Sequence, residues 1–311
     1  MLDTINLKLL QSDVVDADFV EETTAYLSGI GELNFNGDIV ITGSVGNLKV
    51  SLNRYQIKIK DGSLCKWFLG NNFEALSRRD IQMAIEKLSD ILHLPIHKAT
   101  VTRLDVAQNF ICRCPVEVYF NHLGVLKHAT RLQEPNGVYY KQANGRLCFY
   151  DKIKEQKSKG EPIPELYKGC NVLRYEQRYT KRLASQFGVP KVTAEMLYDE
   201  VFYIDLVNRW KNVYNSINKI NDITLNFEQM ENRRQLYKMG VLALIERLGG
   251  ELCFIEQVVE AQKKGILTKK QAYDLKQVAK EACKVKGGFV IANDAIKELD
   301  KKVDEAVKYY R

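Results

Sequence analysis

Three segments of this 311-residue chain carry polar side chains of catalytic type at alternate positions. They span residues 101–110 (VTRLDVAQNF), 146–152 (RLCFYDK) and 171–178 (NVLRYEQR). Side chains on a β-strand point alternately to its two faces, so each segment has one polar and one apolar face. We therefore predict three strands that each present their reactive side chains on one side.

The polar faces of these segments combine two carboxylates, one phenol and several cations. If the three apolar faces pack on one core, the polar faces form a single surface. A tyrosine, paired acids and arginines on one surface suit metal-assisted attack of the tyrosine on a phosphodiester. The polar residues are Arg103, Asp105, Asn109, Arg146, Tyr150, Lys152, Arg174, Glu176 and Arg178.

A sheet face that is merely solvated is the alternative interpretation. Antiparallel sheets commonly leave one face to water, and charges on such a face need no function. Lone carboxylates set among arginines on three separate strands are unusual for a purely solvated face. We therefore favour the functional interpretation.

The order and spacing of these motifs resemble rolling-circle replication initiators of the Rep_trans type, with similarity also to the filamentous-phage gene II and gene X replication proteins. In that family a TRLD-x-A-x-D strand, an aliphatic-x-aliphatic-Tyr-(Asp/Asn)-Lys strand and an Arg-x-Glu strand follow one another. The matching residues here are Thr102 to Asn109, Phe149 to Lys152, and Arg174 to Glu176. The resemblance covers residues 100–185.

The resemblance implies that Tyr150 is the DNA-cleaving nucleophile and forms a 5′-phosphotyrosine, leaving a free 3′-OH. Asp105 and Glu176 would hold Mg²⁺ or Mn²⁺ through oxygen ligands. The family's second acid is Asn109 here, and an amide oxygen ligates a hard cation without adding charge. We therefore expect a site that holds its metal more weakly.

Tyr150 needs assistance to react at neutral pH. The pKa of a free phenol is about 10, so a cation or a base must stabilise the phenolate. Lys152 and Arg146 share the predicted face of Tyr150 and are the candidates for this role.

Basic charge is concentrated around the predicted site. Residues 111–190 hold eight Lys and six Arg against seven Asp and Glu, which accounts for the whole formal net charge of +7. Such a surface suits the phosphate backbone of single-stranded or cruciform origin DNA, because neutralised phosphates release counterions. The predicted DNA contacts are Arg103, Arg146, Arg174, Arg178, Lys181 and Arg182.

The chain has no P-loop motif, which excludes a built-in helicase motor of that type. A host helicase and polymerase are therefore expected partners, and a homodimer stays open.

Seven irregularly spaced cysteines indicate reduced thiols, and the histidines lack metal-site spacing. No signal peptide or apolar run of about 18–20 residues is present, so we expect a cytoplasmic protein without membrane contact.

The patterning predicts an α+β fold. We expect an N-terminal, largely antiparallel sheet with packed helices, as in nicking endonucleases, followed by an all-helical C-terminal region. Residues 32–70 are predicted as short strands joined by turns, and residues 77–95 as a capped amphipathic helix. We place a catalytic DNA-nicking domain at residues 1–189 and a helical domain at residues 190–311.

Two basic clusters lie at predicted helix ends in the second half, at residues 232–238 (NRRQLYK) and 263–271 (KKGILTKKQ). They could reach phosphates, but solvated helix faces carry such residues routinely. A surface for a helical partner or a dimer is equally consistent with the pattern.

The sequence thus predicts site-specific, metal-dependent DNA nicking and closing that initiates rolling-circle replication of a phage or plasmid. A relaxase for conjugative or mobilisable transfer would use the same chemistry. A non-catalytic DNA-binding replication protein would form no covalent adduct with DNA. Both alternatives stay open at this point.

Overall fold

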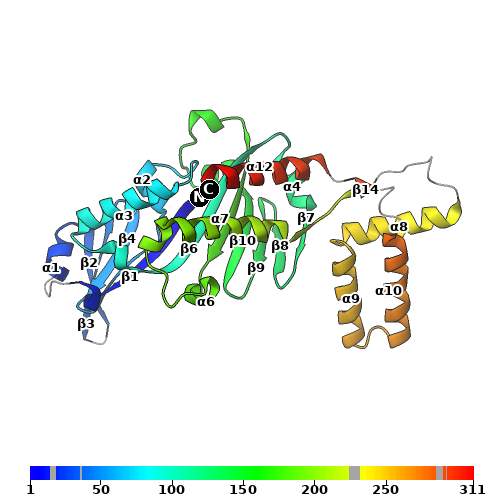
Figure 1. Ribbon diagram of the computed structural model, residues 1–311, viewed down its shortest axis with the longest axis horizontal. Helices are drawn as coiled ribbons and strands as arrows, with labels where there is room; N and C mark the ends of the chain where they lie inside the picture. Colours follow the sequence, from blue (N-terminus) through cyan, green and yellow to red (C-terminus); the bar gives the residue numbers. More distant parts are fainter. Residues whose placement is uncertain (15–18, 36, 224–231, 285–289, 292) are drawn as a thin grey trace.

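The computed structural model describes residues 1–14, 19–35, 37–223, 232–284, 290–291 and 293–311. Within these residues, ten strands form one antiparallel sheet in the order β2-β3-β4-β5-β1-β6-β11-β10-β9-β8 (Figure 1). Strands at both ends of the sheet pair with their neighbours in the chain. At its centre, β1, β6 and β11 bring together segments that are far apart in the sequence.

The meander predicted within residues 32–70 is confirmed for strands β2 to β5 but not for residues 64–69, which form helix α2. Ser63 begins this helix, since its side chain accepts a hydrogen bond from the Lys66 amide. The strands of the large sheet are β1 (Leu2–Leu10), β2 (Ser28–Phe35), β3 (Asp38–Val45), β4 (Leu48–Asn53), β5 (Gln56–Lys60), β6 (Thr100–Cys112), β8 (Thr130–Glu134), β9 (Gly137–Lys141), β10 (Gly145–Asp151) and β11 (Asn171–Tyr179).

One face of the sheet is covered by helices α3 (Arg78–Leu92), α4 (Val116–His122), α7 (Glu200–Asn215) and α12 (Asp294–Tyr310) (Figure 1). The predicted helix at residues 77–95 is confirmed as α3 (Arg78–Leu92), with a capping box between Ser77 and Asp80. The other helices of this part of the chain are α1 (Phe19–Thr24), α2 (Leu64–Leu69), α4 (Val116–His122), α5 (Lys152–Ser158) and α6 (Leu183–Phe187), with short 3-10 turns η1 (Gln11–Asp13), η2 (Ile96–Lys98), η3 (Glu165–Tyr167) and η4 (Glu195–Tyr198).

The apolar side chains of the three predicted strands pack into this helix-covered core. Their buried members are Leu104, Val106, Phe110, Leu147, Phe149, Leu173, Tyr175 and Tyr179. Burial of each apolar side chain stabilises the fold by about 1.5–3 kcal/mol. The core therefore directs the polar faces of all three strands to the opposite side of the sheet.

The C-terminal part is mainly helical, which confirms the predicted α+β class. Its helices are α7 (Glu200–Asn215), α8 (Arg233–Arg247), α9 (Glu251–Lys263), α10 (Lys269–Cys283) and α12 (Asp294–Tyr310). Short strands also occur, with β12 (Ile217–Lys219) pairing with β7 (Leu123–Leu126) and β13 (Asp222–Ile223) pairing with β14 (Val290–Ile291).

Helices α8 and α10 share a small core of their own, formed by Leu242, Ile245, Ala279 and Ala282. In contrast, α7 and α12 contribute to the core of the large sheet. The domain boundary placed after residue 189 stays a prediction. In the part of the chain that the structure describes, no helix has both the length and the apolar character that a membrane crossing requires.

Candidate active site

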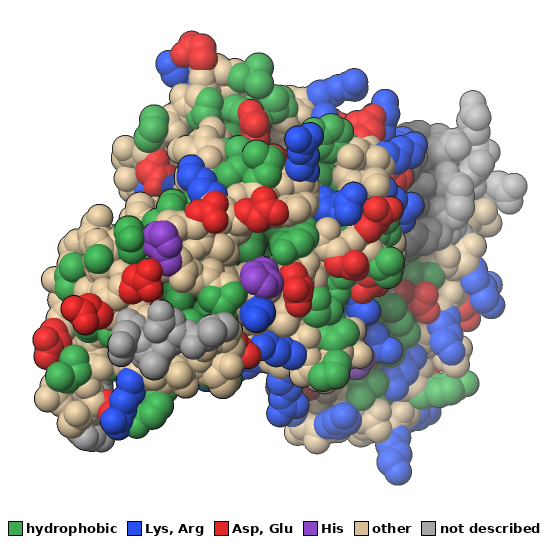
Figure 2. Space-filling model, turned by 60° about the vertical axis from the view of Figure 1, so that its left-hand side comes forward, with side chains coloured by type: hydrophobic (Ala, Val, Ile, Leu, Met, Phe, Trp, Pro, Cys, Tyr) green, Lys and Arg blue, Asp and Glu red, His purple; other side chains and the backbone are tan. Residues whose placement is uncertain are grey.

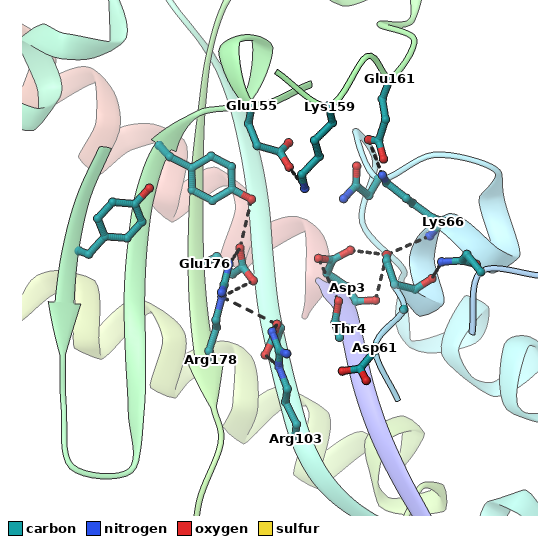
Figure 3. A pocket seen from close by; sticks show the side chains of 17 residues that line it. Asp3, Thr4, Asp61, Lys66, Arg103, Glu155, Lys159, Glu161, Glu176 and Arg178 are labelled. Atoms are coloured by element: carbon teal, nitrogen blue, oxygen red, sulfur yellow. Dashed lines mark hydrogen bonds and ion pairs between the residues drawn. The ribbon is translucent and has the colours of Figure 1, made fainter. Parts of the chain in front are cut away.

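A hollow of about 530 Å³ opens on the polar face of the sheet (Figure 3). Strands β1, β6, β9, β10 and β11 contribute to its lining, and the segments around α2 and α5 supply its rim. The charged and aromatic residues that line it are Asp3, Asp61, Lys66, Arg103, Asp105, Tyr139, Tyr150, Glu155, Lys159, Glu161, Glu176 and Arg178.

Strand pairing places the three predicted segments side by side in the order β6-β11-β10. Arg174 on β11 lies opposite Asn109 of β6 and Tyr150 of β10. Arg178, four residues further along β11, lies opposite Asp105. Residues that pair directly across an antiparallel sheet point to the same face. The predicted single polar surface is therefore confirmed.

Asp105 and Glu176 form a buried acid pair, with side chains 1% and 3% exposed. Arg103 donates hydrogen bonds of 3.0 and 2.5 Å to Asp105, and Arg178 donates bonds of 2.8 and 3.2 Å to Glu176. Burial raises the pKa of Asp105 to about 7. Burial also opposes ionisation of Glu176, but Arg174 and Arg178 outweigh it and lower the pKa of Glu176 to about 2. The pair therefore holds one proton below neutral pH.

The phenol of Tyr150 points at this acid pair. Its Oη donates a hydrogen bond to Oε2 of Glu176 over 3.2 Å. Burial raises the pKa of Tyr150 well above its usual value, whereas the charge of Arg174 acts in the opposite direction. A neutral phenol bonded to a carboxylate is the arrangement expected of a nucleophile beside its proton acceptor.

Arg174 is a buried cation at the site, with a side chain 2% exposed. Its guanidinium lies 2.7 Å from Asp3 and donates hydrogen bonds to the carbonyl of Asn72 at 3.0 Å and to Oδ1 of Asn109 at 3.3 Å. A buried charge is tolerated only when it is paired and hydrogen-bonded. These three partners fix the guanidinium on the strand position that pairs with Tyr150.

Asn109 lies beside the hollow rather than in its lining. Its Oδ1 accepts the hydrogen bond from Arg174, and its amide donates to the carbonyls of Asn72 at 3.0 Å and Phe73 at 2.7 Å. The side chain thus connects the buried guanidinium to the segment that follows α2. Its role as a metal ligand stays a prediction.

Replacing Asn109 by Leu, a side chain of similar volume, is expected to lower the free energy of unfolding by about 2–4 kcal/mol, because three buried hydrogen bonds are lost, to the carbonyls of Asn72 and Phe73 and from Arg174. Urea denaturation would measure this change. The control Asn121→Leu removes an exposed amide and is expected to change the free energy by less than about 0.5 kcal/mol. Equal stability of the Asn109 variant and the parent would contradict the connecting role.

The predicted strand position of Lys152 is wrong. Strand β10 ends at Asp151, whose side chain caps helix α5 by accepting from the Lys154 amide. The alternation therefore stops, and Nζ of Lys152 turns into the interior, donating to Glu155 at 2.7 Å and Gln156 at 3.1 Å. Burial lowers the pKa of Lys152 to about 8. Lys152 does not line the hollow.

Besides Arg174, whose side chain is buried, three predicted DNA contacts also lie outside the lining of this hollow. The guanidinium of Arg146 stacks over the ring of Tyr139 at 4.3 Å. Lys181 and Arg182 line a separate hollow of about 300 Å³ near the end of β11. A role in DNA binding stays a prediction for all three.

The structure adds charged residues that sequence patterning missed. Asp3 enters the site because β1 pairs with β6, although the two strands are far apart in the chain. On the rim, Lys66 pairs with Glu161, and Lys159 pairs with Glu155. The strand-like alternation of residues 1–10 was a usable signal for Asp3, but nothing local indicates the two rim lysines.

The acid pair offers a suitable donor set for a divalent cation. Among the described residues, no group of three or more His, Cys, Asp or Glu side chains is arranged to hold a metal. Mg²⁺, however, commonly keeps several waters and binds through one or two carboxylates plus substrate phosphates. A buried acid pair that retains a proton is also a place where a cation can replace that proton.

Comparison with known proteins identifies one family. No curated protein matches the chain. A family model described as the N-terminal region of the phage gene II replication-associated protein matches residues 1–213, which include all of the central strands and α7 up to residue 213. Since the match covers more than half of the chain, the protein belongs to this family of filamentous-phage gene II-type rolling-circle replication proteins.

Proposed function

We propose that the protein nicks and rejoins DNA at a specific site through Tyr150, and so initiates rolling-circle replication. The observation that carries this proposal is the hydrogen bond from Oη of Tyr150 to Glu176 at 3.2 Å, inside a hollow lined by Arg103 and Arg178. Family membership favours a role in replication over conjugative transfer.

Tyr150 would attack the scissile phosphorus. A bond forms between Oη and phosphorus, and the bond from phosphorus to the 3′-oxygen breaks, leaving a 5′-phosphotyrosine and a free 3′-OH. The phenolic proton passes to Glu176, which already accepts it in a hydrogen bond, and the departing 3′-oxygen takes a proton from water. The 3′-OH can prime synthesis, and the phosphotyrosine bond keeps the energy needed for rejoining.

Arginines of two kinds would assist this step. Arg174, which is buried, offsets the charge that develops on the phenolate of Tyr150. Arg103 and Arg178, with side chains 28% and 31% exposed, can bind the oxygens of the phosphate that enters the hollow. Their present bonds to the acid pair hold them in position.

Asp105 and Glu176 are the residues that would hold Mg²⁺ or Mn²⁺. The bound cation would polarise the phosphate and stabilise the negative charge of the transition state. Single-stranded or cruciform origin DNA is the proposed substrate. A host helicase and polymerase are the proposed partners for strand separation and synthesis, and homodimer formation stays open.

Covalent trapping on DNA tests the proposal. Single-stranded fragments of the DNA that encodes the protein, labelled at the 3′ end, would be incubated with the full chain and Mg²⁺ or Mn²⁺. We expect a labelled adduct that resists denaturant, because the downstream fragment carries the phosphotyrosine. Cleavage without an adduct would indicate hydrolysis, and absence of both would favour the non-catalytic alternative.

The rate of nicking is expected to rise with pH and level off above about 7. The raised pKa of Asp105 means that the acid pair retains a proton below this pH. Glu176 is ionised throughout this range, so the change lies in Asp105, which must lose its proton before both acids can hold a cation. A pH–rate profile under single-turnover conditions would measure the inflection. A flat profile from about one pH unit below to one unit above this inflection would contradict the role of the pair.

A further inference from the structure

Helix α10 and its C-terminal cap carry a row of four lysines and one tyrosine that the nicking site does not use. The members of this row are Lys269, Tyr273, Lys276, Lys280 and Lys284, which we call the α10 stripe. At 100° per residue, these positions fall within an arc of about 80° on the helix surface. The stripe runs for about 22 Å along the helix.

The side chains of the stripe are available to a ligand. Lys269, Lys280 and Lys284 are exposed, Lys276 is half-buried, and the ring of Tyr273 is 62% exposed. Among the described residues, no carboxylate lies within ion-pair distance of these four lysines. Lys238 and Lys264 of the same helical unit do have acidic partners.

The acids of α10 lie on a different face of the helix. Asp274 and Glu281 are rotated by about 100–120° from the middle of the stripe. Glu281 lies 3.9 Å from Lys238 of α8, and Glu260 of α9 lies 2.7 Å from Lys264. Opposite charges therefore meet between or within the helices, and the stripe contains no acidic residue.

The whole unit of α8 to α10 is basic. Residues 232–284 contain eleven Lys and Arg against six Asp and Glu. The space-filling view shows Lys and Arg side chains gathered at the lower right of the molecule, towards the side on which Figure 1 draws α9 and α10 (Figure 2). The small core shared by α8 and α10 is separate from the core that supports Tyr150.

We propose that the α10 stripe is a second DNA-binding surface, which holds the phosphate backbone while Tyr150 acts elsewhere on the strand. Four lysines that have no acidic partner among the described residues supply the charge that phosphates require. The exposed ring of Tyr273 offers a base of single-stranded DNA a stacking partner. The proposal extends the proposed nicking function, but it makes its own claim about binding.

Fluorescence anisotropy with the full chain tests the stripe. The probes would be a labelled single strand of about 40 nucleotides, long enough to span several binding sites, and a duplex of the same length, each titrated over a range of salt concentrations. For Lys276→Gln with Lys280→Gln, the slope of log K against log salt on the single strand should fall by about 1.4, which corresponds to two lost phosphate contacts. Affinity at about 0.15 M salt should then fall on the order of tenfold.

The matched control is Lys301→Gln with Lys308→Gln, which removes two exposed lysines from α12. The control should keep the parent slope. An equal loss in both double variants would mean that only net charge matters, and an unchanged slope in the α10 variant would mean that the stripe does not bind DNA. Either result overturns the proposal. An effect confined to the binding of an acidic protein would overturn it as well.

Tyr273→Ser separates the two forms of DNA. Loss of one stacked base should reduce affinity for the single strand about fivefold or more and leave duplex affinity unchanged. Nicking of a short oligonucleotide that covers only the cleavage site should match the parent in all three variants. The parent could also bind DNA through the stripe and form no adduct. That result would contradict the proposed nicking function and still support DNA binding by the stripe.

Discussion

Replacing Tyr150 by Phe is expected to abolish covalent attachment of the protein to DNA. The substitution removes the only atom of this side chain that can form the phosphotyrosine bond, and it keeps the ring. We expect the cleavage rate to fall by at least about 10³-fold, as for other lost nucleophiles. A gel of labelled single-stranded DNA under denaturing conditions would measure both the adduct and the cleaved fragment.

Tyr139→Phe is the matched control, because Tyr139 lines the same hollow but bonds to neither acid in the described structure. This variant should form the adduct at the parent level. Both variants should keep the parent's circular dichroism spectrum, since loss of one hydroxyl costs about 1 kcal/mol. An adduct that persists in Tyr150→Phe would assign the nucleophile to another tyrosine.

Replacing Glu176 by Gln is expected to reduce nicking by about 100-fold or more. The change removes the acceptor for the proton of Tyr150, one of two ligands proposed for the cation, and a charge that faces Arg178. Loss of a positioned acid–base group alone typically costs about 10²–10⁴-fold in rate. Single-turnover cleavage with Mg²⁺ titrated over a wide range would measure the effect.

The fold must be checked in this variant, because breaking a buried ion pair costs about 3–5 kcal/mol. Asp105→Asn provides a second test, since it removes the other proposed cation ligand without touching the hydrogen bond of Tyr150. Glu161→Gln, on the rim beside Lys66, is the control that should retain activity within a few-fold. Full nicking by Glu176→Gln or Asp105→Asn in excess chelator would show that the acid pair is only structural.

The central strands could be predicted because their signal is local. The alternation in residues 101–110 and 171–178 specifies which side chains share a face, whatever the strand pairs with. The capping residues of α3 lie within one helical turn of one another and were equally readable. The order of the motifs likewise pointed to the family that the match over residues 1–213 shows.

The end of strand β10 could not be predicted from the alternation of polar and apolar residues. Strand β10 and helix α5 meet at Asp151, where the side-chain period changes from about 2.0 to about 3.6. Lys152 is therefore a helical residue, and its buried Nζ bonds to Glu155 and Gln156 instead of lining the hollow. The pattern of apolar residues does not mark this change, because Lys152 is polar in either setting. Only the cap geometry at Asp151 decides it.

The sequence by itself determined the fold class, the shared polar face and the grouping of Tyr150 with two acids on that face. The tertiary structure decided which other residues complete the site. Asp3 joins the site because β1 pairs with β6. The side chain of Asn109 is hydrogen-bonded to Arg174 and to two backbone carbonyls. These contacts join residues that are far apart in the chain, and local patterns carry no information about which distant segments will meet.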